Sequence, residues 1–254
     1  MKLPSAPASS TTFKNAPGST VPEEYALEVR KDPGQIKEMA ETPQEVKDLQ
    51  KESLARQYVI IVDRSGSMDT PDGARPGTRW TSAEKAVENM IDTVFKYDVD
   101  HTIPLYIFDH EVIFLGEVTD RKQVKAVFKE YKPRGTTGLN GALKEALETY
   151  AGTKRPNYEI VPGTTFIVLL DGGADNESEV IRTLQHFADP RNGYIANHTQ
   201  IAVSFIQIGD DSSATRFLKK LDDTIEPDIV DTKKDDLLYT QGGLDRILYD
   251  AIFD

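Results

Sequence analysis

Cysteine is absent from this sequence of 254 residues. Its absence excludes disulfide bonds, thiolate metal ligands and a cysteine nucleophile. The sequence also lacks any run of about 18 apolar residues, the length that a membrane-spanning helix needs. Residues 1–7 lack the apolar centre of a signal peptide. We therefore expect a protein with no membrane span and a cytoplasmic location.

Basic residues are too few to balance the acidic ones. The chain has 30 Lys and Arg against 42 Asp and Glu, a formal net charge of −12. Such a surface is poorly suited to the phosphates of nucleic acids or to anionic lipid. Hydrophobic residues make up 38% and charged residues 28% of the chain, which is ordinary for a soluble domain. We expect no nucleic-acid partner and a surface that attracts cations.

The composition changes near residue 55. Residues 1–20 are rich in proline, serine and threonine, with few large apolar groups, which predicts disorder. A short helix is predicted over 42–54, with Thr42 as its cap and Pro43 at its first position. We therefore expect a low-complexity N-terminal segment, 1–55, and one folded domain, 56–254. Partner binding is the alternative role for the N-terminal segment.

From residue 57 onward, strand and helix patterns alternate. Apolar runs predict strands at 57–62, 102–108, 111–115, 165–170, 201–208 and 228–231. The segments between and after them show helical periodicity, and Thr81 with Glu84 predicts a capping box at one helix start. This alternation predicts a Rossmann-like, doubly wound α/β fold with a mostly parallel central sheet and helices on both faces. A turn at Asp109–His110 predicts one antiparallel edge strand.

Polar loops follow two of these strands and precede one helix. Asp63–Ser67 follows the strand at 57–62, Asp171 and Gly172 follow the strand at 165–170, and Gly135–Leu139 opens a helix. Right-handed crossovers bring such loops to the same edge of a parallel sheet. Carboxylates and hydroxyls are the hard donors that Mg²⁺, Mn²⁺ or Ca²⁺ prefer. The pattern predicts a metal site where these loops meet.

The same residues resemble a known family, the von Willebrand factor type A (vWA) domain. Its metal-ion-dependent adhesion site (MIDAS) is built from a D-x-S-x-S loop, a distant threonine and a distant aspartate. Here Asp63–Ser67 is similar to the first part, and Leu170-Asp171-Gly172 is similar to the family's T-D-G. The family's G-G-T-x-L-x-x-A-L pattern aligns with Gly135–Leu143, which places Thr137 at the ligand threonine. The resemblance covers about 56–254, and its last third looks like intracellular microbial and fungal members.

The resemblance implies how a metal would be held. The metal residues that it implies are Asp63, Ser65, Ser67, Thr137 and Asp171. The two serines and the threonine would bind Mg²⁺ directly, and the two aspartates would hold metal-bound waters. An Asp or Glu of a partner protein would fill the exchangeable position. The resemblance therefore implies a non-enzymatic adaptor within a multi-protein assembly, and residues expected to lie near the partner are Arg64, Met68, Thr136, Gly172 and Arg79.

Two other functions are compatible with the pattern. The first is a Mg²⁺-dependent, phosphatase-like hydrolase with Asp63 as the nucleophile. That chemistry typically needs a second acid two residues later, where this chain has Ser65. Neither a P-loop nor a G-x-S-x-G elbow occurs in the sequence. The second is a metal-free scaffold. We expect the interaction module rather than an enzyme.

Overall fold

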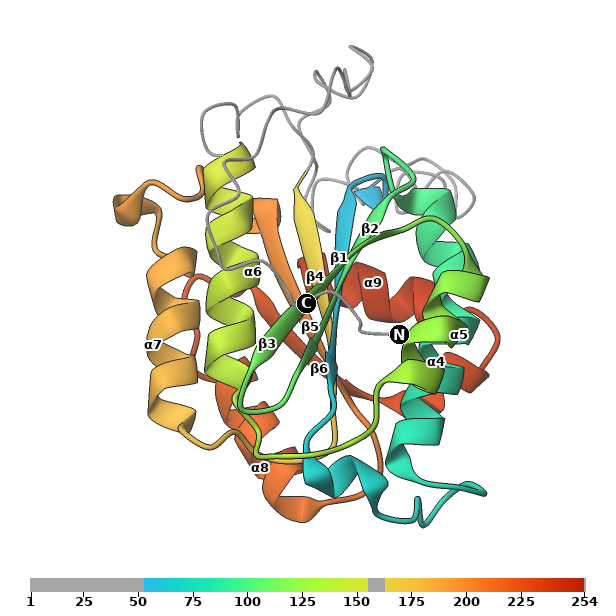
Figure 1. Cartoon of the computed structure of the whole chain (residues 1–254). Coiled ribbons are helices and arrows are strands. Elements are labelled where there is room, and N and C mark those ends of the chain that lie inside the picture. The colour runs from blue at the N-terminus through green and yellow to red at the C-terminus, as the bar shows by residue number, and fades with distance from the viewer. Residues whose placement is uncertain (1–52, 155–162, 254) are drawn as a thin grey trace, which may run out of the picture.

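The computed structural model describes residues 53–154 and 163–253, with a six-stranded sheet at the centre (Figure 1). The strands are β1 (Gln57–Asp63), β2 (Ile103–Phe108), β3 (Val112–Val118), β4 (Thr164–Leu170), β5 (Ile201–Gln207) and β6 (Val230–Lys234). Their order is β3-β2-β1-β4-β5-β6, and only β2 and β3 pair antiparallel. The predicted fold class, with its single antiparallel edge strand, is confirmed. The predictions for residues 1–52 lie outside the described residues.

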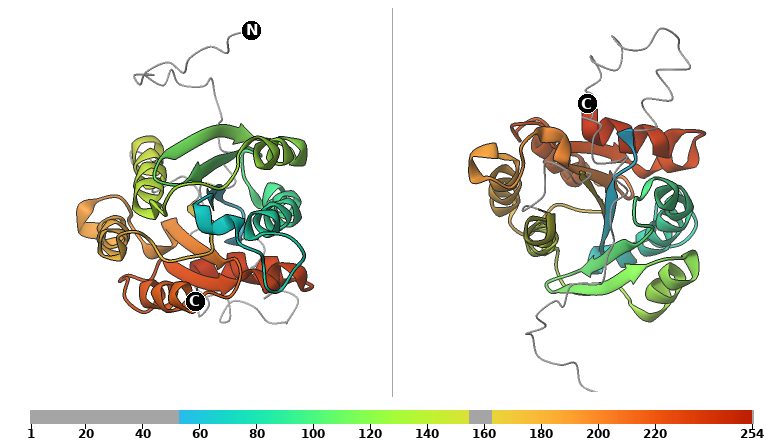
Figure 2. Two further views of the ribbon diagram at one scale, coloured as in Figure 1. Left: turned by 60° about the horizontal axis from the view of Figure 1, so that its bottom comes forward. Right: turned by 90° about the horizontal axis from the view of Figure 1, so that it is seen from above.

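Helices cover both faces of the sheet (Figures 1 and 2). One face carries α4 (Arg79–Tyr97), α5 (Arg121–Glu130) and α9 (Gly243–Phe253), and the other carries α6 (Leu139–Lys154), α7 (Glu177–Ala188) and α8 (Ser212–Asp222). Successive side chains of a strand point to opposite faces, so Ile60 and Val62 join the first core, whereas Ile61 joins the second. Short 3₁₀ helices are η1 (Gly66–Asp69), η3 (Pro190–Asn192), η4 (His198–Gln200) and η5 (Asp235–Tyr239).

None of the helices in the described ranges combines the length and the apolar character that crossing a membrane requires. The longest of these helices, α4, spans 19 residues, and its exposed side carries charged groups such as Lys85 and Asp92. Its apolar side faces the sheet.

Helix α4 begins earlier than the sequence predicts. The expected capping box of Thr81 and Glu84 is wrong, because the helix starts at Arg79 and Thr78 is its N-cap. The Thr78 side chain accepts a hydrogen bond from the Thr81 backbone N–H at 3.3 Å. Two threonines three residues apart both suit the cap, and the structure uses the first. The consequence is that Arg79 becomes the first helical residue.

The sheet reverses its winding direction between β1 and β4. From β1 the chain crosses over to β2 on one side, whereas β4 lies on the other side of β1. Ligands of open α/β sheets collect at the carboxyl ends of strands flanking such a switch point. The register pairs Val62 with Leu169, so Asp63 and Asp171 leave neighbouring strands at the same edge. This edge is at the bottom of Figure 1.

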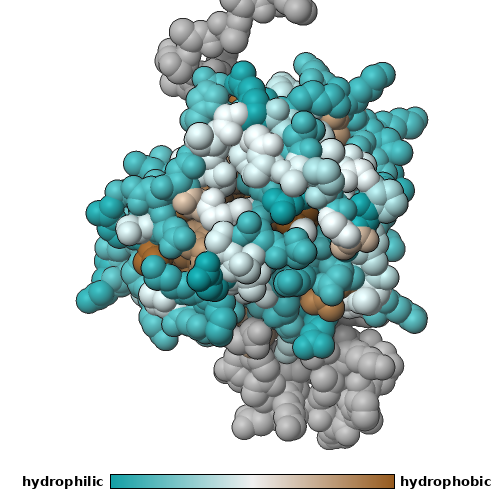
Figure 3. Space-filling model, turned by 90° about the horizontal axis from the view of Figure 1, so that it is seen from below, coloured by the Kyte–Doolittle hydropathy of each residue, from teal (hydrophilic) through white to brown (hydrophobic). Residues whose placement is uncertain are grey.

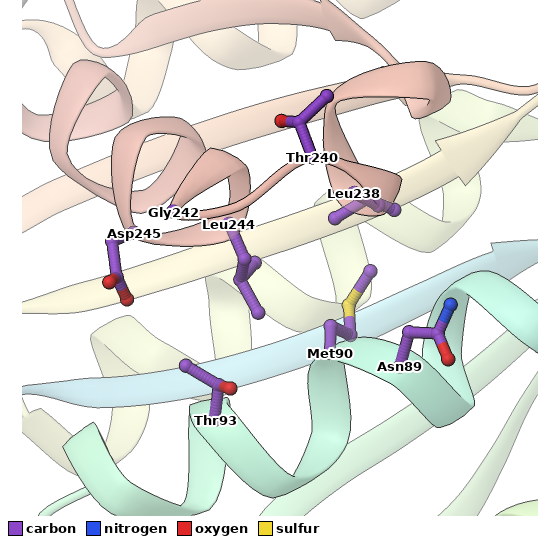
Figure 4. A pocket seen from close by; sticks show the side chains of 8 residues that line it. All are labelled: Asn89, Met90, Thr93, Leu238, Thr240, Gly242, Leu244 and Asp245. Atoms are coloured by element: carbon purple, nitrogen blue, oxygen red, sulfur yellow. The ribbon is translucent and has the colours of Figure 1, made fainter.

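A groove of about 200 Å³ separates α4 from the segment that leads into α9 (Figure 4). Met90 and Leu244 line it from the two sides, and Thr93 and Asp245 make its wall polar. Next to it, the Tyr97 hydroxyl donates a hydrogen bond to Asp245 Oδ1 at 2.9 Å. Helix α9 is thus held to the sheet by its apolar side and to α4 by this hydrogen bond.

A pair of aspartates, buried Asp98 and half-buried Asp100, lies beyond the other end of β1. Asp98 is 1% exposed and accepts hydrogen bonds from the backbone N–H groups of Tyr58 and Thr102, at 3.0 and 3.1 Å. Burial, together with the neighbouring Asp100, raises the pKa of Asp98 to about 8. The pKa of Asp100 is lowered, although burial opposes the change, because Asp98 and Thr102 donate to it. The folded protein therefore favours protonated Asp98.

We expect Asp98→Asn to flatten the pH dependence of stability between about pH 4 and pH 8. A raised pKa in the folded state stabilises the protein below the unfolded pKa, and this stabilisation is lost as the pH rises toward about 8. One such group contributes a slope of up to about 1.4 kcal/mol per pH unit. Urea unfolding at several pH values measures it, with the exposed Asp223→Asn as control. Equal slopes for Asp98→Asn and wild type would contradict the expectation.

Candidate metal centre

The loop after β1 folds around the carboxylate of Asp63. Asp63 is the last residue of the strand and is 0% exposed. Its Oδ1 accepts a hydrogen bond from the Ser65 backbone N–H at 2.7 Å, which turns the chain sharply into η1. This turn is the local conformation that Asp followed by Ser and Gly favours. It leaves Ser65 buried and Ser67 exposed at the edge of the sheet.

A hydrogen-bonded chain connects this loop to Asp171, which follows β4. The Ser65 and Ser67 hydroxyl oxygens lie 3.0 Å apart, and the Ser67 hydroxyl donates to Asp171 Oδ1 at 2.8 Å. Two residues 104 positions apart in sequence therefore touch. Four of the five metal residues expected from the sequence lie together in one cluster, at the end of the sheet that the left view of Figure 2 brings forward.

Thr137 belongs to a third loop, which backbone hydrogen bonds attach to the first. The Gly66 N–H donates to the Gly135 carbonyl at 3.1 Å, and the Arg134 N–H donates to the Arg64 carbonyl at 2.8 Å. The Thr137 N–H donates to Asp175 Oδ1 at 3.1 Å. Thr137 is half-buried, and among the described residues no hydrogen bond joins its hydroxyl to the other four. The structure thus brings its loop to the cluster without a direct side-chain contact.

Gly135 permits this approach. Its φ of +68° is one that residues with a side chain rarely adopt. A Cβ at this position would overlap the ring of His110. This position therefore requires glycine both for its backbone conformation and for lack of space. The glycine lets the Thr137 loop lie against the turn between β2 and β3.

Two arginines and a buried aspartate tie the same loops together. Asp109 is 0% exposed, and its Oδ2 lies 2.7 Å from Arg64 Nη2 and 2.9 Å from Arg134 Nε. The Glu111 N–H donates to its Oδ1 at 2.8 Å. Burial opposes ionisation, but this N–H and the two guanidinium groups lower the pKa of Asp109. One charged carboxylate thus holds the first and third loops in a fixed relation.

The electrostatic environment of Asp63 favours a cation beside it. Burial is the main reason that the pKa of Asp63 rises to about 7. The negative charge of Asp171 also raises this pKa, whereas the hydrogen bond from Ser65 lowers it. Asp63 Oδ2 is buried and has no hydrogen-bond partner within residues 53–154 and 163–253. An unpaired buried carboxylate oxygen is costly unless a cation faces it. Two carboxylates and three hydroxyls are a donor set that fits a divalent, oxygen-preferring metal ion.

A second acidic group, Asp109 with His110 and Glu111, has ligand atoms within 4.8 Å of one another. Both oxygens of Asp109 already have hydrogen-bond partners, and Arg64 and Arg134 bring two positive charges to it. A cation would be repelled there, so the group is better explained as part of the loop connection.

The five residues expected near a partner fall into two groups. Met68 is 0% exposed and lies in the core, and Arg64 is 4% exposed and ion-paired, so neither offers a contact surface in this structure. Thr136 is exposed, and Gly172 and Arg79 are half-buried. Figure 3 views this end of the molecule, whose surface is mostly hydrophilic with small, separate apolar patches.

Sequence reasoning missed two features of the site. It did not identify Asp109 or Arg134 as the residues that join the loops, because nothing in a turn sequence shows which arginines will face it. It also did not show that Arg75, in the loop at 70–78, pairs with Asp235 at 2.6 Å and stacks on Tyr239 at 4.5 Å. Such contacts link residues about 160 positions apart and leave no local signal.

Residues 58–172 match the family model described as von Willebrand factor type A domain. This range contains Asp63, Ser65, Ser67, Thr137 and Asp171. Among curated proteins, no match to this sequence was found.

Solved structures support the same fold. A von Willebrand factor type A protein from Catenulispora acidiphila is 16% identical with a TM-score of 0.54, and the match covers 78% of this chain and 42% of that one. The SpRpn10 VWA domain is 14% identical with a TM-score of 0.52, covering 76% and 94%. The manganese-loaded TRAP protein of Plasmodium vivax is 15% identical with a TM-score of 0.50, covering 72% and 70%. This chain therefore spans less than half of the Catenulispora protein.

Proposed function

This chain contains a von Willebrand factor type A domain, and from that membership we propose that it is a non-enzymatic, divalent-metal-dependent protein-interaction module. Domains of this family commonly mediate protein interactions. In the proposal the ion is Mg²⁺, with Mn²⁺ or Ca²⁺ as alternatives, and an Asp or Glu of the partner completes its coordination. The proposed setting is a multi-protein assembly in the cytoplasm.

The observation that carries the proposal is the unpaired Oδ2 of Asp63, buried beside the chain of hydroxyls that ends at Asp171. Ser65, Ser67 and Thr137 would hold the ion through hydroxyls, and the two aspartates would supply the negative charge. When bound, the ion would offer a partner carboxylate an electrophilic position. The Ser65–Ser67–Asp171 hydrogen bonds orient the two serine oxygens beforehand.

The geometry argues against the hydrolase alternative. A nucleophilic aspartate must reach its substrate, but Asp63 is 0% exposed and its Oδ1 is engaged by the Ser65 N–H. The position of the second acid is occupied by Ser65, which is 1% exposed. A phosphatase assay with Mg²⁺ tests the point, and activity that Asp63→Asn abolishes would overturn the non-enzymatic proposal.

The test of the proposed function is a pull-down from lysate of the native host with three baits. They are the wild-type protein in Mg²⁺, the wild-type protein in EDTA, and Asp63→Asn in Mg²⁺. We expect a partner that only the first bait retains, because both metal removal and loss of the Asp63 charge empty the site. Asp69→Asn is the matched control, since Asp69 is an exposed acid of the same loop.

The partner is then checked by replacing its acidic residues one at a time. A single Asp or Glu whose amide variant loses binding supports coordination to the ion. If the same proteins are retained by all three baits, recognition is metal-independent, and the scaffold alternative replaces our proposal.

A further inference from the structure

Arg79 places a positive charge inside the candidate metal centre. It is the first residue of α4, and its Nη1 lies 2.8 Å from Asp171 Oδ2. The Arg79 side chain is 14% exposed, and that of Asp171 is 0% exposed. The other oxygen of Asp171 accepts the Ser67 hydroxyl. Both oxygens of Asp171 therefore have partners among the side chains of this chain.

Contacts with two neighbouring loops hold Arg79 in this position. The Arg79 backbone N–H donates to the Thr70 carbonyl at 2.9 Å, which fixes the helix start beside the loop. Across from it, Gly209 has a φ of +77°, and a Cβ there would lie 3.0 Å from Arg79 Nε. Because Gly209 has no side chain, the guanidinium fits between the loop after β5 and Asp171. The pKa of Asp211 in that loop is lowered, first by Ser213 and also by the charge of Arg79.

The two carboxylates of the centre therefore differ in whether a nearby cation already balances their charge. Asp63 has a buried oxygen with no partner, whereas Asp171 is neutralised by Arg79. A divalent ion entering the cluster would gain the attraction of both aspartates but meet the repulsion of the arginine. From this contrast we infer that Arg79 is an internal counterion, which competes with the divalent cation for Asp171 and lowers the affinity of the centre for that cation. The inference rests on the proposed metal-binding function.

The competition has a consequence for regulation of the site. In the metal-free domain the ion pair satisfies a buried charge that would otherwise be unpaired. In the metal-bound domain the same guanidinium is a positive charge next to the ion. Removing it should therefore tighten metal binding and at the same time destabilise the metal-free protein, a pair of opposite effects that a merely structural arginine would not produce.

The experiment titrates the full chain with Mn²⁺ and measures free Mn²⁺ by electron paramagnetic resonance. Arg79→Gln and Arg79→Met remove the charge, and the methionine keeps an apolar stem against Gly209. We expect both to bind Mn²⁺ about tenfold more tightly than wild type, equivalent to about 1.4 kcal/mol. Arg79→Lys retains the charge and should bind like wild type. Arg75→Gln is the matched control, because Arg75 pairs with Asp235 and Asp72 and not with the centre.

Thermal unfolding in EDTA is the second measurement. Both neutral variants should melt below wild type without metal and show a larger increase with Mn²⁺. If all proteins bind Mn²⁺ but the neutral variants bind no more tightly, the inference is overturned and the proposed function stands. If only the neutral variants bind Mn²⁺, the inference is supported, and the proposal that the natural chain functions through a metal ion is overturned. If none binds, both are overturned.

Discussion

Saturating Mg²⁺ or Mn²⁺ should raise the melting temperature of the wild-type protein, and Asp63→Asn should remove this response. A ligand at 100 times its Kd stabilises the folded state by about 2.7 kcal/mol. For a domain of this size, one kcal/mol shifts the melting temperature by about 2–4 °C. The expected increase is therefore about 5–10 °C, which differential scanning calorimetry with and without EDTA measures.

The variant separates the metal from the fold because of how Asp63 is bonded. An asparagine can still accept the Ser65 N–H that Oδ1 accepts at 2.7 Å, so the turn after β1 is preserved. It removes a buried charge that faces Asp171 and has one oxygen without a partner. In EDTA, Asp63→Asn should thus be at least as stable as wild type.

The matched control is Asp69→Asn, which removes one negative charge from an exposed position of the same loop. It should retain the full metal response. A wild-type melting temperature that is equal in Mg²⁺ and EDTA would contradict the prediction. So would an Asp63→Asn protein that responds to metal as wild type does, because the ion would then bind elsewhere.

The fold could be predicted because its signals are local and repeated. Near-continuous apolar runs such as Thr165–Leu170 are typical of strands buried on both faces, and β4 is buried at every position. The antiparallel β3 could be predicted from the short turn at Asp109–His110, since two parallel strands need a long crossover. The start of α4 could not be placed, because Thr78 and Thr81 are equally good caps in isolation.

The site could be predicted only as far as its residues follow the ends of predicted strands. Asp63 and Asp171 do so, and parallel pairing of β1 with β4 brings them to one edge. The contacts that hold the cluster are of a different kind. Arg79 lies 92 positions from Asp171, and Arg134 lies 25 positions from Asp109. Which cation faces which carboxylate depends on how loops pack, and no periodicity encodes it.

Asp109→Ala should be the most destabilising single substitution near the centre. It leaves the Arg64 guanidinium, whose side chain is 5% exposed, without its carboxylate, and Arg134 loses one of its two acidic partners. Breaking a buried ion pair by removing one member costs about 3–5 kcal/mol. Since Arg134 is half-exposed, most of the loss comes from Arg64. Calorimetry in EDTA should show a melting temperature lower by about 10 °C.

Two further variants show whether the loss comes from the buried pair. Glu111→Gln removes the exposed partner of Arg134 and should leave the melting temperature almost unchanged, because solvent screens this pair. Arg134→Gln leaves the Arg64–Asp109 pair intact, and its loss of stability should lie between those of Glu111→Gln and Asp109→Ala.

Because the Arg134 N–H donates to the Arg64 carbonyl, loosening Arg64 also loosens the loop that carries Thr137. Asp109→Ala should therefore bind Mn²⁺ more weakly at temperatures where it is still folded. If Asp109→Ala has the same melting temperature as Glu111→Gln, backbone hydrogen bonds alone hold the loops together.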